Sequence, residues 1–74
     1  MPEDIEAQVK SVIIGFLGNK EIQINSELRN NLGADSLNMV EIFLAIEKKF
    51  NIKIQKEQKQ KIVTVGDIIN LLEA

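Results

Sequence analysis

The sequence contains no cysteine and no histidine, and each absence excludes a class of protein. A small domain without cysteine cannot be held together by disulfides. Because the chain also lacks histidine, only carboxylates could bind zinc, and carboxylates alone make poor zinc sites, so we expect no metal site. A nucleophile that relies on histidine as its base cannot form within the chain either. The absences therefore favour a domain held together by its apolar core and argue against an enzyme.

Aromatic residues and unbalanced charge are also scarce. The chain has three phenylalanines, no tryptophan or tyrosine, and a net charge of −2 from 9 basic and 11 acidic residues. A nucleic-acid-binding protein would show a basic stripe, which is missing here. No apolar run approaches the roughly 18 residues of a membrane-spanning helix, and the acidic start MPEDIEAQ is unlike a signal peptide. We expect a cytoplasmic monomer that neither binds nucleic acid nor spans a membrane.

Seventy-four residues, 45% of them apolar, predict a single domain over residues 1–74. A first helix is expected over residues 3–17, with negative charge at its start and Gly18 at its end. Its apolar residues recur at helical spacing, which predicts that they face the core. These residues are Ile5, Val9, Val12, Ile13, Phe16 and Leu17. Residues 19–35 form a long connection, which we expect to be pinned to the bundle by Ile22, Ile24, Leu28 and Leu32.

Three further segments complete the expected fold. A second helix should run from about Ser36 to Phe50, and a short helical segment should follow at about residues 56–61. Thr64 is the expected N-cap of a final helix, with Asp67 placed three residues later as in a capping box. The prediction is an all-α fold, namely a small antiparallel helical bundle with three main helices, a short third segment, and a long loop between the first and second helices.

The second helix has two apolar faces. Met39, Ile42, Phe43, Ile46 and Phe50 lie on one face, which suffices to join the core. A second stripe on another side comprises Leu37, Val40 and Leu44. This stripe could pack under the long loop, or it could be an exposed docking surface ringed by charge.

Ser36 stands at the start of this helix, directly after Asp35. One interpretation is an ordinary cap, in which Asp35 or Ser36 accepts a hydrogen bond from a backbone N–H group. The other is a modification site, because the N-terminus of a helix favours a bound phosphate.

The segment LGADSLNMVEIFLAIEKKF, residues 32–50, resembles the prosthetic-group site of acyl carrier proteins of dissociated fatty acid synthesis. The centre of that family's pattern is Gly-Ala-Asp-Ser-Leu at the start of the second helix, which Gly33 to Leu37 match. The later segments EKKFNIKI and KIVTVGDII also match, so the resemblance covers essentially the whole chain.

The resemblance implies that a separate phosphopantetheinyl transferase attaches 4′-phosphopantetheine to Ser36, close to Asp35. The thiol of that group would carry growing fatty acyl chains as thioesters between fatty acid synthesis enzymes and acyltransferases. It also implies a partner-facing surface made of Leu37, Val40, Glu41, Leu44 and Glu47.

The aliphatic core predicts a further property. Because it is mostly isoleucine, leucine and valine, we expect it to open and take in the tethered acyl chain. The expected entrance lies between Leu44 or Ile46 and the segment around Ile62 and Ile68, and the expected pocket comprises Ile46, Ile62 and Ile68.

The chain departs from the family's pattern in its charge, because members of the family are typically strongly acidic. Lysines stand at positions 48 and 49, and the segment QKEQKQK is basic. Two alternatives to a fatty acyl carrier remain at this point. One is a carrier of another cargo, such as a polyketide, a lipid A acyl chain or an aminoacyl group. The other is an unmodified helical interaction module.

Overall fold

The computed structural model describes residues 4–18 and 21–73 of the chain and contains four helices. They are α1 (Ile5–Leu17), α2 (Ser36–Phe50), α3 (Lys56–Lys61) and α4 (Val65–Glu73). Within these ranges the only β-type pairing is an isolated bridge between Glu27 and Thr64. The all-α prediction is confirmed, including the short helical segment at 56–61.

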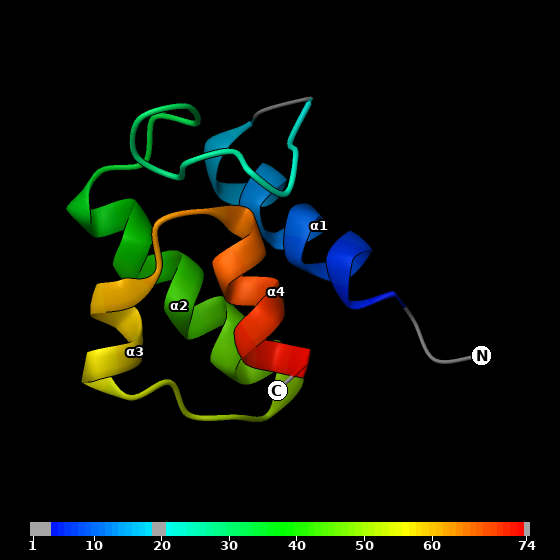
Figure 1. The fold of residues 1–74 in the computed structure, drawn as a ribbon, viewed down its shortest axis with the longest axis vertical. Coiled ribbons are helices and arrows are strands. Elements are labelled where there is room, and N and C mark those ends of the chain that lie inside the picture. Colours follow the sequence, from blue (N-terminus) through cyan, green and yellow to red (C-terminus); the bar gives the residue numbers. More distant parts are fainter. Residues whose placement is uncertain (1–3, 19–20, 74) are drawn as a thin grey trace.

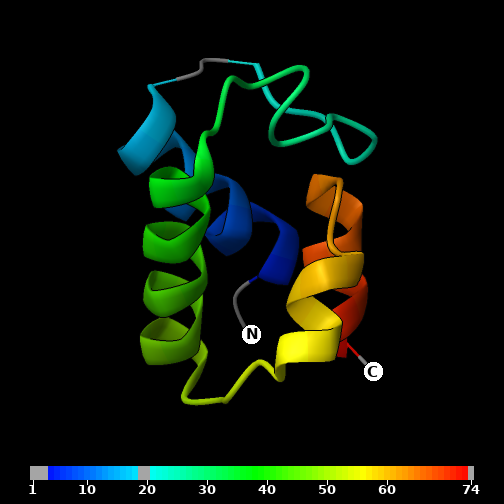
Figure 2. The same ribbon diagram turned by 90° about the vertical axis from the view of Figure 1, so that its left-hand side faces the viewer.

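The three longer helices do not all run in the same direction. Figures 1 and 2 show α2 and α4 running in the same direction, with α1 running the opposite way and contacting both. The connection crosses one end of the bundle and delivers the chain to the start of α2 (Figure 2). α3 is antiparallel to α2 and lies on the side of the bundle opposite α1 (Figure 1).

The ends of α1 are set by two local signals. Asp4 is the N-cap, and its side-chain oxygen accepts a hydrogen bond of 3.0 Å from the N–H group of Glu6. The helix therefore begins two residues later than predicted, because Asp4 caps it from outside. Residue 3, where the helix was predicted to begin, lies outside the described residues. At the other end Gly18 has a φ of 73°, which confirms the predicted left-handed stop.

The core contains only apolar side chains among the residues that the structure describes. The predicted face of α2 is confirmed, since Met39, Ile42, Phe43 and Ile46 are buried and Phe50 packs against them. A core without buried polar side chains has no side-chain hydrogen bonds to break when those side chains rearrange.

Phe16 departs from the prediction for α1. Val9 and Ile13 are fully buried, but Phe16 is 42% exposed. Phe16 shares a face of the helix with Val9, since seven residues make nearly two turns. In the last turn of α1, however, that face lies beside the outer side of α2, where Phe16 and Leu44 line one hollow. The prediction that Phe16 joins the core is wrong.

The long connection is held down by three of its four expected apolar residues. Ile22, Leu28 and Leu32 are buried, whereas Ile24 is 51% exposed. Ile24 is held through its backbone instead, because its carbonyl oxygen accepts a hydrogen bond of 2.7 Å from the N–H group of Gly66. The pinning role predicted for the Ile24 side chain is therefore wrong.

Backbone hydrogen bonds join this connection to the start of α4. They run from Leu28 N to Val63 O at 2.9 Å, from Val65 N to Ser26 O at 3.0 Å, and from Gly66 N to Ile24 O at 2.7 Å. The first N–H groups of a helix have no partner inside the helix. Two of those at the start of α4 are satisfied by the connection, so the loop and the helix depend on each other.

The predicted capping box of α4 is confirmed. The hydroxyl oxygen of Thr64 accepts a hydrogen bond of 3.1 Å from the N–H group of Asp67. One carboxylate oxygen of Asp67 accepts hydrogen bonds from the N–H groups of Thr64 at 3.0 Å and Val63 at 2.9 Å. The bond from the Thr64 N–H group, followed by that from Val63, lowers the pKa of Asp67 below its ordinary value.

We expect Gly66→Ala to destabilise the fold. A Cβ atom at residue 66 would lie 2.6 Å from Cγ2 of Ile24 and 3.1 Å from its carbonyl oxygen. The backbone hydrogen bond from Gly66 to Ile24 must therefore shift. Such overpacking costs about 1–3 kcal/mol. Gly15→Ala is the matched control, because a Cβ there meets nothing within 4 Å and should stabilise α1 by roughly 0.5–1 kcal/mol. Urea denaturation measures both changes, and equal effects at the two positions would contradict this account.

The low pKa of Asp67 makes part of the stability depend on pH. The ionised carboxylate stabilises the folded state, so its contribution is complete above the ordinary pKa of 3.8 and is lost as pH falls through the lower folded value. Asp67→Asn keeps one acceptor oxygen but cannot ionise. The wild type should therefore be more stable than the variant at neutral pH, with a difference that shrinks below about pH 4. Denaturation curves from pH 2 to pH 7 measure this difference, and a constant difference would show that the charge contributes nothing.

Candidate functional site

The start of α2 is capped by Asp35 and not by Ser36. A carboxylate oxygen of Asp35 accepts a hydrogen bond of 2.8 Å from the N–H group of Asn38, and the Asn38 side-chain oxygen accepts one of 3.1 Å from the N–H group of Asp35. Ser36 is the first residue of the helix, and it is exposed. Its hydroxyl group forms no hydrogen bond to any described residue. The capping role is thus filled by a neighbour, and the Ser36 hydroxyl faces solvent.

The turn before Ser36 is tightly held. Gly33 has a φ of 81°, a left-handed conformation that glycine adopts without steric cost. Ala34 and Leu32 on either side of it are buried. The N–H group of Ala34 donates a hydrogen bond of 2.8 Å to the carbonyl oxygen of Leu28, the residue that also pairs with Val63. The position of Ser36 is therefore tied through the loop to the start of α4.

The second apolar stripe of α2 is exposed. Leu37 is 65% exposed, Val40 53% and Leu44 50%. The alternative in which this stripe packs under the long loop is therefore wrong. The three side chains begin directly beside Ser36 and continue for two turns of the helix.

The two acidic residues predicted to border this stripe differ in their surroundings. Glu41 is half-buried. Glu47 has a structural contact that the sequence did not reveal, because its carboxylate accepts a hydrogen bond of 2.8 Å from the N–H group of Ile54. Its backbone carbonyl also accepts a hydrogen bond from Asn51, the left-handed residue that ends α2. Glu47 thus holds the link between α2 and α3.

A hollow of about 370 Å³ lies between α2, α3 and the loop. Met39, Phe43 and Ile62 are its apolar lining, and its polar lining comes from Arg29, Lys56, Lys59 and Gln60. The Lys59 ammonium stands over the Phe43 ring, 5.9 Å from its centre. Of the predicted pocket residues, Ile62 lines this hollow, while Ile46 and Ile68 are fully buried in the core.

Leu44 does not line the hollow that contains Ile62. It lines a different hollow, which it shares with Phe16 of α1. Helical spacing shows which residues share a face, but not which neighbouring helix covers that face.

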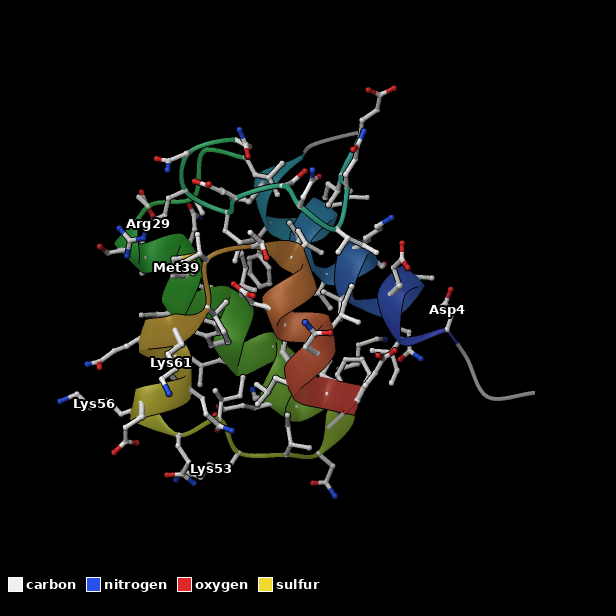
Figure 3. All side chains as sticks on the ribbon, viewed as in Figure 1. Asp4, Arg29, Met39, Lys53, Lys56 and Lys61 are labelled. Carbon is white, nitrogen blue, oxygen red and sulfur yellow. The ribbon has the colours of Figure 1, made fainter. Side chains whose placement is uncertain are left out.

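Positive charge is concentrated beside α3. Residues 48–61 contain six lysines and one acidic residue, Glu57. Figure 3 shows Arg29, Lys53, Lys56 and Lys61 around this side of the molecule, with Asp4 on the opposite side. Within the described ranges there is no cluster of three acidic side chains that could hold a metal ion, and no helix there is both long and apolar enough to cross a membrane.

Comparison with known proteins agrees with this geometry. Residues 7–72 match the family model described as the phosphopantetheine attachment site. The chain is 42% identical to the acyl carrier protein of Wolinella succinogenes over 67 residues, which cover 88% of each chain. The chain belongs to the acyl carrier protein family. It carries acyl chains, and its prosthetic group is 4′-phosphopantetheine.

Further relatives of this carrier support the same assignment. It is 41% identical to the acyl carrier protein of Helicobacter pylori over 71 residues, which cover 96% of this chain and 88% of that one. The solved structure of a candidate acyl carrier protein from Mycobacterium tuberculosis superimposes with a TM-score of 0.87 at 31% identity, covering 90% of this chain and 92% of the other. One from Anaplasma phagocytophilum has a TM-score of 0.85 at 31% identity, with 95% and 85% covered.

Proposed function

We propose that this carrier holds fatty acyl groups on a 4′-phosphopantetheine arm attached to the oxygen of Ser36. The observation that supports the assignment is that Asp35 caps α2, so that the adjacent Ser36 hydroxyl is exposed and without a hydrogen-bond partner among the described residues. When bound, the arm supplies a terminal thiol that holds the acyl group as a thioester.

The residues around Ser36 suit a phosphodiester. The backbone N–H groups of Ser36 and Leu37 lie in the first turn of α2, where they have no acceptor within the helix. These groups and the helix dipole favour a negative charge at this end. A phosphate attached to the Ser36 oxygen would therefore be stabilised by the same helix that presents the hydroxyl.

The carrier would act as a substrate and a shuttle, with no catalytic step of its own. A phosphopantetheinyl transferase would load Ser36, and fatty acid synthesis enzymes and acyltransferases would then act on the cargo in the cytoplasm. Leu37, Val40 and Leu44 offer these partners an exposed apolar contact next to Ser36. Glu41 and Asp35 border this contact with negative charge, which favours a cationic partner surface.

The hollow between α2 and α3 is the proposed entrance for the acyl chain. Its lining residues Met39, Phe43 and Ile62 are apolar, and Met39 is one turn from Ser36 along α2. From there the chain would reach Ile46 and Ile68 in the core. Burial of each CH₂ group contributes about 0.8 kcal/mol, part of which is lost in opening the packed interior.

Ser36→Ala should abolish modification while leaving the fold intact. Because Ser36 is exposed and does not cap the helix, its loss should change the free energy of unfolding by about 0.5 kcal/mol or less. Intact mass after incubation with a transferase and coenzyme A should show the added arm on the wild type and on the control Ser11→Ala, but not on Ser36→Ala. An added arm on Ser36→Ala would contradict the assignment. Intact mass of the carrier from its own cell identifies the cargo, since another acyl class would have a different mass.

Acylation should raise the melting temperature if the chain enters the bundle. We expect the octanoyl form to melt above the butyryl form, and both above the unloaded holo form, because each buried CH₂ adds to stability. Ile62→Phe should fill the entrance and remove most of the gain for octanoyl. Ile52→Phe is the matched control, since Ile52 is 38% exposed and the larger ring there should leave the gain intact. Equal melting temperatures for the holo, butyryl and octanoyl forms would show that the chain lies in solvent.

A further inference from the structure

Three cationic side chains line the hollow between α2, α3 and the loop. Arg29 comes from the loop, and Lys56 and Lys59 stand three residues apart in α3, where they are neighbours on the helix surface. Figure 3 shows Arg29 and Lys56 on the same side of the molecule as Met39. No acidic residue of the described chain lines this hollow. Entry of an uncharged hydrocarbon chain needs no charge at the entrance, so the function proposed above gives these cations no role.

Neighbouring carboxylates do not neutralise these three cations. Within residues 4–18 and 21–73, the one ion pair joins Lys10 to Glu6 in α1, on the other side of the bundle. Glu27 shares an adjoining hollow with Arg29, and its carboxylate accepts a hydrogen bond from the side chain of Asn30. The positive charge that lines the hollow is therefore available to a ligand.

Lys59 brings this charge directly over apolar surface. It is half-buried, and its ammonium group stands 5.9 Å from the centre of the Phe43 ring. Met39 and Ile62 continue the apolar lining beside that ring. A ligand that combines an anionic head group with a hydrocarbon tail would contact both kinds of surface at once.

We propose that this hollow binds a free single-chain anionic amphiphile, such as a fatty acid or an alkyl phosphate, without a covalent bond. The planar guanidinium group of Arg29 can donate two parallel hydrogen bonds to a carboxylate or a phosphate, and the two lysines add positive charge. The tail would lie against Phe43 and Ile62. The volume of about 370 Å³ is within the range of small-molecule pockets. The binding needs neither Ser36 nor the prosthetic arm, so it goes beyond the function proposed above.

Occupation of the hollow would also affect the cargo. The same hollow is the proposed entrance for the tethered acyl chain, and one space cannot hold both tails. A free fatty acid would therefore compete with the cargo for the bundle. This consequence rests on the proposed function, whereas the binding itself does not.

The first test compares head groups on probes with matched tails. Decanoate, decyl phosphate, decanol and decyltrimethylammonium are titrated into the Ser36→Ala chain, in which no prosthetic arm can occupy the hollow, below the concentration at which each forms micelles. NMR signals of Met39, Phe43 and Ile62 should shift and give the Kd. At least one of the two anions should bind about tenfold more tightly than decanol, and the cation should bind more weakly than decanol. The tighter anion identifies the head group, and added salt should weaken its binding but not that of decanol.

The second test asks whether the lining cations recognise the head group. Arg29→Gln/Lys56→Gln removes two charges from the hollow and should raise the Kd of the tighter anion about tenfold, to that of decanol. Lys48→Gln/Lys49→Gln is the matched control, because it removes the same charge from residues that line two other hollows, both on the side of α1. Its Kd should stay within about twofold of that of the Ser36→Ala parent. Melting curves confirm that each variant is folded.

Three results would overturn the proposal. They are equal Kd values for decanol and both anions, equal losses in the two double variants, and shifts centred on residues outside this hollow. None of them bears on the modification of Ser36, which intact mass tests separately. The two proposals can therefore fail independently.

Discussion

The structure depends on the backbone pairing between the long connection and the start of α4. This pairing satisfies N–H groups of α4 that a helix leaves without internal partners, and it is possible only because residue 66 has no side chain. The same stretch of loop continues to Leu28, whose carbonyl oxygen accepts the Ala34 N–H group directly before the Asp35–Ser36 pair. A contact at the N-terminus of the last helix therefore determines where the second helix presents its serine.

Because Asp35 caps α2, the hydroxyl group of the adjacent Ser36 remains available for chemistry. A serine at the N-cap of a helix usually accepts a hydrogen bond from a backbone N–H group, and that bond would hold its hydroxyl against the helix. Here Asp35 and Asn38 form the reciprocal capping box, and Ser36 occupies the next position, where its side chain points away from any described partner. The helix contributes its favourable end to a phosphate without using the hydroxyl for its own stability.

Local signals in the sequence predicted the helices, the glycine that ends α1, the capping box of α4 and the place of Ser36, because each of these depends on residues within one or two turns of one another. Contacts between distant segments were not predictable. Phe16 has the spacing of a core residue but lies beside the outer face of α2, and Glu47 reads as a surface charge but holds the N–H group of Ile54. The separation of Leu44 from the hollow that contains Ile62 was not predictable for the same reason, since it depends on which helix covers which face.

The helix that is least firmly anchored in the bundle, α3, forms one wall of the proposed entrance for the acyl chain. α3 has no buried residue of its own, and it is held mainly at its ends by the buried side chains of Ile54 and Ile62. Its contact with α2 includes Lys59 over the ring of Phe43, an attraction worth only about 0.5–1 kcal/mol at an exposed site. Segments with few buried apolar contacts open at the lowest free-energy cost. The wall of the hollow formed by α3 can therefore move away from α2 while the pairing of the loop with α4 keeps Ser36 in place, so the proposed entry of cargo would leave the attachment site intact.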